Sequence, residues 1–240
     1  MTDPKPTEPE PLKRFYQSAG VGETGEGATV LLDGRPIRTP ARAVLAVPHP
    51  VAERIAAEWN AQDDVIRPLT MPLTRLANSA IDGVSTAIED VQGDIAEIAG
   101  NDLVFYRADW PAGLVAAQRA RWDPLVRYGE ERTGVRLVLA AGVMPVSQDP
   151  RFAEAIRASL PAEPLPLAAL HQLTTLTGSA LAALASADGT LSFEEAWAAA
   201  YVDEDWNVAE WGEDAEATAR RAARSRDAEA AHFVLTVQRS

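Results

Sequence analysis

The fold of this 240-residue chain is decided by residues 28–40, which read ATVLLDGRPIRTP. The apolar run at 29–32 is typical of a strand, and Asp33-Gly34 is typical of a two-residue hairpin turn. Residues 35–40 then indicate a second strand, whose prolines suit the edge of a sheet. A third short strand is expected over 43–47. This pattern predicts a small mixed domain near the N-terminus.

The residues before this hairpin carry two weaker signals. Residues 1–11 contain four prolines among charged residues and are expected to form a disordered tail. Residues 20–25, GVGETG, match the G-x-G-x-x-G string. A dinucleotide site needs that string to follow a strand and open a helix, whereas this one precedes a strand. We therefore predict a flexible glycine loop at 20–25 rather than a nucleotide site.

Helices are predicted for most of the chain after the hairpin. Val51, Ile55 and Trp59 recur at the spacing of one helix face, so we expect all three to be buried. From Met71 onward, helices are expected near 73–83, 85–100, 112–133, 150–159, 165–186, 192–209 and 214–235. Short strands are candidates only at 103–106 and 137–146. The predicted fold class is α+β, with a tail at 1–11, a mixed domain at 12–85 joined near Asp82-Gly83, and a helical domain at 86–240.

Composition excludes several classes of function. The chain has 35 Asp and Glu against 22 Lys and Arg, a net charge of -13, which disfavours nucleic acid and anionic membranes as partners. The absence of cysteine excludes disulfides and thiol chemistry. No apolar run reaches the ~20 residues that span a bilayer, and the N-terminus lacks the pattern of a targeting segment. A soluble, cytoplasmic protein is therefore expected.

Motifs for catalysis or metal binding are weak. The three histidines, His49, His171 and His232, are too far apart in sequence to form a metal-binding motif. No G-x-S-x-G or S-x-x-K string offers an activated serine. The acidic residues from Asp203 to Asp214 approach the pattern of a calcium loop, but Val208 replaces the required glycine. We expect no cofactor, no metal and no small-molecule substrate.

The most informative stretch for function is 191–214. Ser192 and Glu195 form a capping box that predicts a helix start. On one continuous helix, Glu204 would lie within an apolar stripe about 80° wide, made of Phe193, Trp197, Tyr201, Val208 and Trp211. The small residues over 178–185 are expected to let another helix approach closely. A carboxylate on an apolar stripe either pairs with an internal arginine or faces a partner, and both interpretations stay open.

The order of several strings resembles one known family, the assembly chaperone for the alpha subunit of the F-type ATP synthase catalytic head (the "ATP-twelve" family). The strings extend over nearly the whole chain beyond the tail, so the resemblance is specific. They are LDGRPIRTP at 32–40, EWNAQ at 58–62, MPLTRLA at 71–77, AID at 80–82, Q-x-x-x-WDPL at 118–125, DEDW at 203–206, EWGEDAEA at 210–217 and RR at 220–221.

This resemblance implies a small mixed domain followed by a helical one, and a non-enzymatic chaperone without a cofactor. It also implies a client, the free alpha subunit, whose apolar surface is shielded until the beta subunit covers it. The family's critical glutamate aligns with Glu204, so client-binding residues are expected to be Glu204, Asp203, Asp205, Trp206, Trp211 and Gly212. Tyr201, Val202 and Trp206 differ from many relatives, which leaves the contacts at those positions undefined.

The family that the chain resembles is found in the mitochondrial matrix and in related bacteria, and the lack of a transit sequence makes a bacterial member that works in the cytoplasm the expectation. Two alternatives come from different classes of function: a small hydrolase-like enzyme that uses Glu204 with a neighbouring acid, and a structural adaptor that only offers a binding patch. An enzyme needs a second catalytic group within reach of Glu204. An adaptor needs only an exposed surface.

Overall fold

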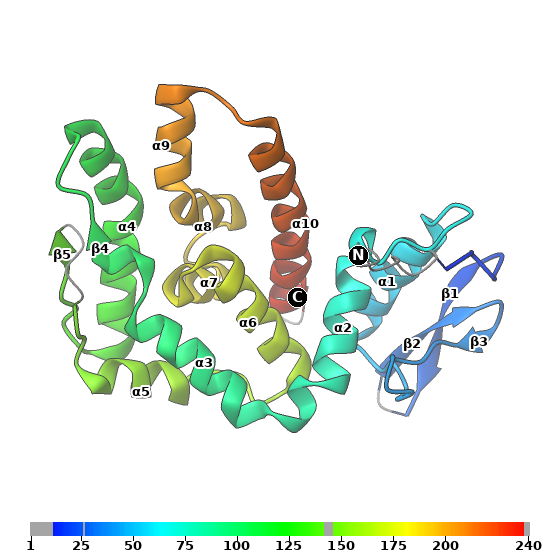
Figure 1. Ribbon diagram of the computed structural model, residues 1–240. Helices are drawn as coiled ribbons and strands as arrows, with labels where there is room; N and C mark the ends of the chain where they lie inside the picture. The colour runs from blue at the N-terminus through cyan, green and yellow to red at the C-terminus, as the bar shows by residue number, and fades with distance from the viewer. Residues whose placement is uncertain (1–11, 26, 142–145, 238–240) are drawn as a thin grey trace, which may run out of the picture. The chain divides into compact units, whose positions relative to one another are not determined.

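The computed structural model describes residues 12–25, 27–141 and 146–237, which form two compact units that divide between Asn78 and Ser79. The first unit carries a three-stranded sheet and the second is mostly helical, so the fold class is α+β, as predicted (Figure 1). The predicted tail at 1–11 and part of the candidate strand at 137–146 lie outside the described residues. The division falls within α2 (Pro72–Asp82).

The sheet of the first unit is antiparallel, with the order β1 (Ala19–Thr24), β2 (Gly27–Leu32) and β3 (Arg35–Pro36). The predicted Asp33-Gly34 turn joins β2 to β3. Asp33 has φ 47° and Gly34 has φ 80°, as a tight hairpin turn of this kind requires. The hairpin prediction is therefore confirmed, but its second strand covers only 35–36 and not the predicted 35–40.

Two strand predictions in this unit were wrong. Residues 20–25 are not a loop, because β1 covers 19–24 and pairs with β2 along its length. A side chain on Gly22 would come within 2.8 Å of Leu31 Cδ1, so glycine there lets Leu31 pack over the neighbouring strand. Residues 43–47 form no strand but only the isolated bridges Arg38–Val44 and Ala28–Val47.

Helix α1 (His49–Asn60) packs on β1 and β2. Val51 and Ile55 are fully buried, as predicted. The Glu58 carboxylate accepts hydrogen bonds from the backbone N–H groups of Leu73 (2.7 Å) and Thr74 (2.8 Å), and thereby caps α2. Burial raises the pKa of Glu58. The short 3-10 helix η1 (Pro68–Thr70) precedes α2.

Trp59 is half-buried rather than buried. Its indole lies edge-on to Tyr16, with ring centroids 5.4 Å apart, and its backbone oxygen accepts a hydrogen bond from the Tyr16 hydroxyl at 2.7 Å. Truncation of a buried Trp costs about 3–5 kcal/mol, so Trp59→Ala is expected to reduce the free energy of unfolding by about 2 kcal/mol. Urea denaturation measures the change, with Trp59→Phe as the milder control. An unchanged midpoint for Trp59→Ala would show that the ring does not stabilise the fold.

The second unit contains the remaining helices and two very short strands. β4 (Tyr106–Arg107) pairs in parallel with β5 (Ala140–Ala141). The other elements are η2 (Val84–Thr86), α3 (Ile88–Gly100), η3 (Leu103–Phe105), α4 (Ala112–Thr133), α5 (Pro150–Ala158), α6 (Pro164–Thr177), α7 (Ala180–Ala187), α8 (Phe193–Ala200), α9 (Val202–Trp211) and α10 (Ala215–Val237). Among the described residues, no helix combines the length and the apolar character that a membrane span requires.

Two helices that were predicted as continuous are broken. The helix expected over 165–186 ends at Gly178, which has φ 66°, and α7 starts after Ser179, whose hydroxyl accepts a hydrogen bond from Ala182 N. The helix expected over 192–209 is divided at Tyr201 into α8 and α9. The predicted capping box of Ser192 and Glu195 is present.

Helix α7 lies at the centre of the second unit. Its residues from Ala180 to Ser186 are all buried, and it contacts α3, α4, α6, α8 and α10. α10 also runs along α6 (Figure 1). Because most of α7 is alanine, its neighbours can approach closely, as predicted for the small residues over 178–185.

Asp102 is fully buried beside the N-terminus of α7. Its carboxylate accepts hydrogen bonds from Leu181 N (3.0 Å) and from Val104 N (3.2 Å) in η3. Burial raises the pKa of Asp102 to about 6. This carboxylate therefore joins two distant segments of the chain through backbone hydrogen bonds.

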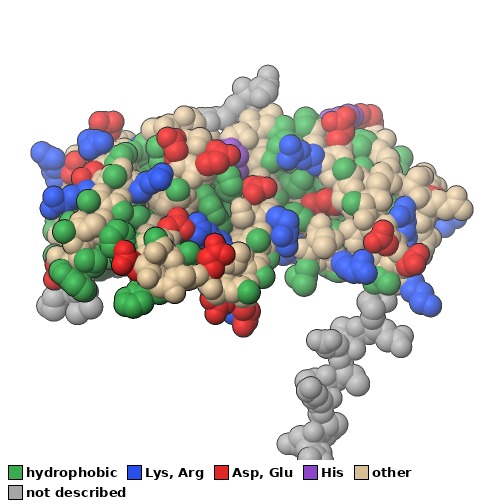
Figure 2. Space-filling model, turned by 90° about the horizontal axis from the view of Figure 1, so that it is seen from above, with side chains coloured by type: hydrophobic (Ala, Val, Ile, Leu, Met, Phe, Trp, Pro, Cys, Tyr) green, Lys and Arg blue, Asp and Glu red, His purple; other side chains and the backbone are tan. Residues whose placement is uncertain are grey.

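The surface carries charges of both signs. On the face shown in Figure 2, acidic and basic side chains are interspersed with apolar ones. The net charge of -13 is therefore not gathered into one acidic patch on this face.

Candidate functional site

The predicted site residues lie on α9, whose position depends on Tyr201. Tyr201 has φ −113° and ψ 17°, which ends α8 and redirects the chain into α9. Its ring lies 4.5 Å from the Trp197 ring, and the Arg221 guanidinium of α10 lies 4.4 Å from its centroid. Its hydroxyl accepts a hydrogen bond from Arg224 Nε at 2.8 Å. Tyr201 thus links α8, α9 and α10.

This break changes the predicted apolar stripe. Phe193 stacks on Trp197 at 6.0 Å, so these two rings and Tyr201 form one cluster. Val208 and Trp211 belong to α9, where they are 39% and 86% exposed. The prediction of one continuous stripe was therefore wrong. The rings of Phe193, Trp197 and Tyr201 pack together, whereas the α9 side chains face solvent.

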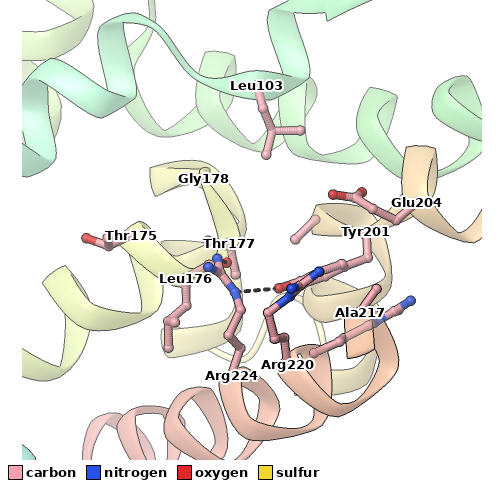
Figure 3. A pocket seen from close by; sticks show the side chains of 12 residues that line it. Leu103, Thr175, Leu176, Thr177, Gly178, Tyr201, Glu204, Ala217, Arg220 and Arg224 are labelled. Atoms are coloured by element: carbon pink, nitrogen blue, oxygen red, sulfur yellow. Dashed lines mark hydrogen bonds between the residues drawn. The ribbon is translucent and has the colours of Figure 1, made fainter. Parts of the chain in front are cut away.

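Glu204 is exposed at the edge of two neighbouring hollows. The inner hollow has a volume of about 410 Å³ and the outer hollow one of about 400 Å³, and Tyr201, Glu204, Ala217 and Arg221 line both. We refer to the two hollows together as the α9–α10 groove. Figure 3 shows the inner hollow, with Glu204 on its α9 side and Arg220 and Arg224 on its α10 side.

Within the part of the chain that the structure describes, Glu204 makes no hydrogen bond and no ion pair. The alternative of a buried internal ion pair therefore does not describe this carboxylate. Asp205 instead forms the ion pair with Arg221, and its hydrogen bond is the main reason that the pKa of Arg221 is raised. The charge of Glu204 also contributes to the raised pKa of Arg221, but the Glu204 carboxylate stays exposed and makes no hydrogen bond among the described residues.

Asp203 and Trp206 attach α9 to α4 instead. The Asp203 carboxylate accepts a hydrogen bond from Gln118 Nε2 at 2.8 Å, and Gln118 is almost fully buried. The Trp206 ring lies so close to Gly113 that a side chain there would come within 2.2 Å of Trp206 Cη2. These two residues hold the helix in place, whereas Glu204 and Asp205 line the groove.

The outer hollow collects the other predicted residues. Trp211 and Gly212 line it together with Val208. Gly212 has φ 89° and ends α9, a conformation that favours glycine. Four of the six predicted residues thus meet at the α9–α10 groove, namely Glu204, Asp205, Trp211 and Gly212.

The prediction missed the basic side of the groove. Arg220, Arg221 and Arg224 all line the inner hollow from α10. Their spacing places them near one another on a helix, which is a signal that the sequence carries. Arg220 pairs with Glu216 at 2.5 Å and Arg224 donates to the backbone oxygen of Leu176 at 2.7 Å. These arginines are thus partly occupied within the unit.

Comparisons with known proteins agree with one another. A family profile described as ATP12 chaperone protein matches residues 13–130. The structure of Atp12 from Paracoccus denitrificans is 39% identical, with a TM-score of 0.84, over 94% of this chain and 98% of that one. The Atu1473 protein of Agrobacterium tumefaciens is 45% identical, with a TM-score of 0.87, over 93% of this chain and 85% of that one. The chain belongs to the ATP12 chaperone family.

A curated relative extends the family to eukaryotes. The mitochondrial protein atp12 of Schizosaccharomyces pombe is 24% identical over 224 residues, which cover 85% of this chain and 75% of that protein. The family profile ends within α4, but the two bacterial structures extend the match across the helices that carry the α9–α10 groove. The family resemblance predicted from the sequence is thereby confirmed.

Membership in the ATP12 chaperone family identifies the chain as a non-enzyme. Ser186 Oγ lies 2.9 Å from His232 Nδ1, and Ser186 is fully buried. Burial lowers the pKa of His232. No group of three or more His, Cys, Asp or Glu that could hold a metal ion occurs among the described residues.

Proposed function

We propose that this protein binds the free alpha subunit of the F-type ATP synthase head and keeps it soluble until the beta subunit covers the same surface. The site of binding is the α9–α10 groove, and Glu204 is its central polar contact. The proposal places the protein in the bacterial cytoplasm. Membership in the ATP12 chaperone family and the strings shared with the alpha-subunit chaperones support it.

One observation carries the proposal: an exposed carboxylate that makes no hydrogen bond or ion pair with any described residue lies beside exposed apolar side chains. Trp211 is 86% exposed and Val208 is 39% exposed, and both line the outer hollow with Glu204. Large apolar side chains exposed together with a polar anchor are typical of protein-binding surfaces. An unassembled ring subunit exposes the surface that its neighbour later covers. In a standard interface this surface measures about 800 Å² on each partner.

Co-expression of the alpha subunit with and without this chain tests the function. We expect most of the alpha subunit to be insoluble alone and soluble with the chain, and the two to elute together in gel filtration. An unrelated acidic protein of similar size is the control for a general charge effect on solubility. A structural adaptor would bind the alpha subunit without increasing its soluble yield, and that result would contradict the proposal.

A further inference from the structure

The first unit contains a separate hollow that the proposed function does not use. It has a volume of about 560 Å³ and lies beside the hairpin of β2 and β3. We name it the N-terminal groove and define it by the residues that carry the argument, which are Phe15, Leu32, Arg35, Ile37, Arg38 and Trp59.

The walls of the N-terminal groove are apolar and partly aromatic. Leu32 and Ile37 are buried, while Phe15 is 67% exposed. The Phe15 ring lies edge-on to Tyr16 at 5.5 Å, and Tyr16 contacts Trp59 in the same manner. A phenylalanine this exposed, at the rim of a hollow with an apolar wall, can gain much burial from a partner.

The rim of the groove is basic, although the chain as a whole is acidic. Residues 12–47 contain five Lys and Arg against three Asp and Glu. Arg35 makes no hydrogen bond or ion pair with any described residue, and Arg38 donates to the backbone oxygen of Arg42 at 2.9 Å. Among the described residues, no carboxylate lies within 4 Å of either guanidinium.

The acid on the rim, Asp33, is already used by the fold. Its carboxylate accepts hydrogen bonds from the backbone N–H groups of Ser18 (2.9 Å) and Gln17 (3.0 Å), and these bonds lower its pKa. The Asp33 carboxylate therefore does not compete with a carboxylate of the partner for pairing with Arg35. The local charge favours an acidic partner.

The edge strand of the sheet is not suited to pair with a strand of a partner. β3 is the edge strand of the sheet, but Pro36 lacks a backbone N–H group, and the N–H group of Ile37 already donates to Val30 O at 2.9 Å. A partner strand would find few donors along this edge. Recognition must therefore use the side chains of the groove.

We infer that the N-terminal groove is a second client-binding surface, which takes an acidic segment of the client that also carries an apolar side chain. The apolar side chain packs against Phe15 and the apolar wall of the groove, and the carboxylate pairs with Arg35 and Arg38. This inference rests on the proposed function for the identity of the client. Its chemistry complements that of the α9–α10 groove, where the free charge is the negative one of Glu204.

Site-specific cross-linking in the full chain locates the contact. A photo-reactive phenylalanine analogue at position 15 is expected to cross-link to the bound alpha subunit, in a peptide that contains Asp or Glu next to an apolar residue. The same analogue at Leu69, which is 80% exposed in the same unit, is the matched control. Cross-linking no stronger at position 15 than at position 69 would overturn the inference.

A charge reversal tests the recognition independently. Arg35→Glu is expected to weaken binding of the alpha subunit at least tenfold, with an unchanged melting temperature, because Arg35 makes no hydrogen bond or ion pair with any described residue. Arg67→Glu makes the same charge change at an exposed residue outside the groove and is expected to bind as the wild type does.

The outcomes of this experiment separate the two proposals. If wild-type protein fails to bind the alpha subunit, the proposed function fails, and the inference fails with it. If wild-type protein binds and Arg35→Glu binds equally well, only the inference about the N-terminal groove is wrong.

Discussion

Glu204→Gln is expected to abolish protection of the alpha subunit while the protein stays fully folded. The substitution keeps the shape of the side chain and removes its charge. Glu204 is exposed and makes no hydrogen bond or ion pair among the described residues, so the fold loses only its charge interaction with Arg221. Surface substitutions of this kind change stability by no more than about 0.5 kcal/mol. The expected change in melting temperature is therefore about 2 °C or less.

The measurement is the soluble yield of co-expressed alpha subunit, read together with thermal melting of the purified variant. Glu210→Gln is the matched control, since Glu210 is also exposed on α9 but lines neither hollow of the α9–α10 groove. Normal soluble yield with Glu204→Gln would remove Glu204 from the client-binding site. A large drop in melting temperature would show that the carboxylate serves the fold instead.

Asp102→Ala is expected to be among the most destabilising single changes in the second unit. It would leave the buried N–H groups of Val104 and Leu181 without an acceptor, and each such loss costs about 1–3 kcal/mol. We therefore expect the free energy of unfolding to fall by about 3 kcal/mol at pH 7, measured by urea denaturation. A loss below about 1 kcal/mol would contradict this account of the carboxylate.

The same residue makes stability depend on pH. Its pKa is about 6 in the folded protein against 3.8 as the ordinary value, so the folded state holds the proton more tightly. The stability that results is fully present below pH 3.8 and is lost as the pH rises through 6. Asp102→Asn keeps an acceptor oxygen but does not titrate. Relative to this variant, the wild type is expected to be about 2 kcal/mol more stable at pH 4 than at pH 7.

Local signals in the sequence predicted much of the fold. Helix α4 has the predicted bounds of 112–133, because Pro111 precedes it and Gly134, with φ 69°, ends it. The Asp33-Gly34 hairpin could be predicted in the same way. In both cases the residues that start or end the element lie next to it in the sequence.

Breaks that depend on distant contacts could not be predicted in this way. Tyr201 is neither glycine nor proline, and its contacts with Trp197, Arg221 and Arg224 accompany the turn between α8 and α9. Because this break was missed, the predicted position of Glu204 within a continuous stripe was wrong. The sequence placed Glu204 on a helix, as the structure does. Several side chains around it belong to α10, which follows α9 along the chain.

The exposure of the α9–α10 groove has a consequence for how this region moves. Between residues 203 and 223, all residues except Asp203, Trp206 and Arg221 are exposed, whereas α7 is almost entirely buried. α9 has only 10 residues, and a helix that short is marginal by itself. Segments with so few buried contacts open locally at a free energy well below that of global unfolding. We therefore expect α9 and the start of α10 to exchange amide hydrogens before the rest of the second unit, and we expect a client bound at the proposed site to slow that exchange because it would order both segments.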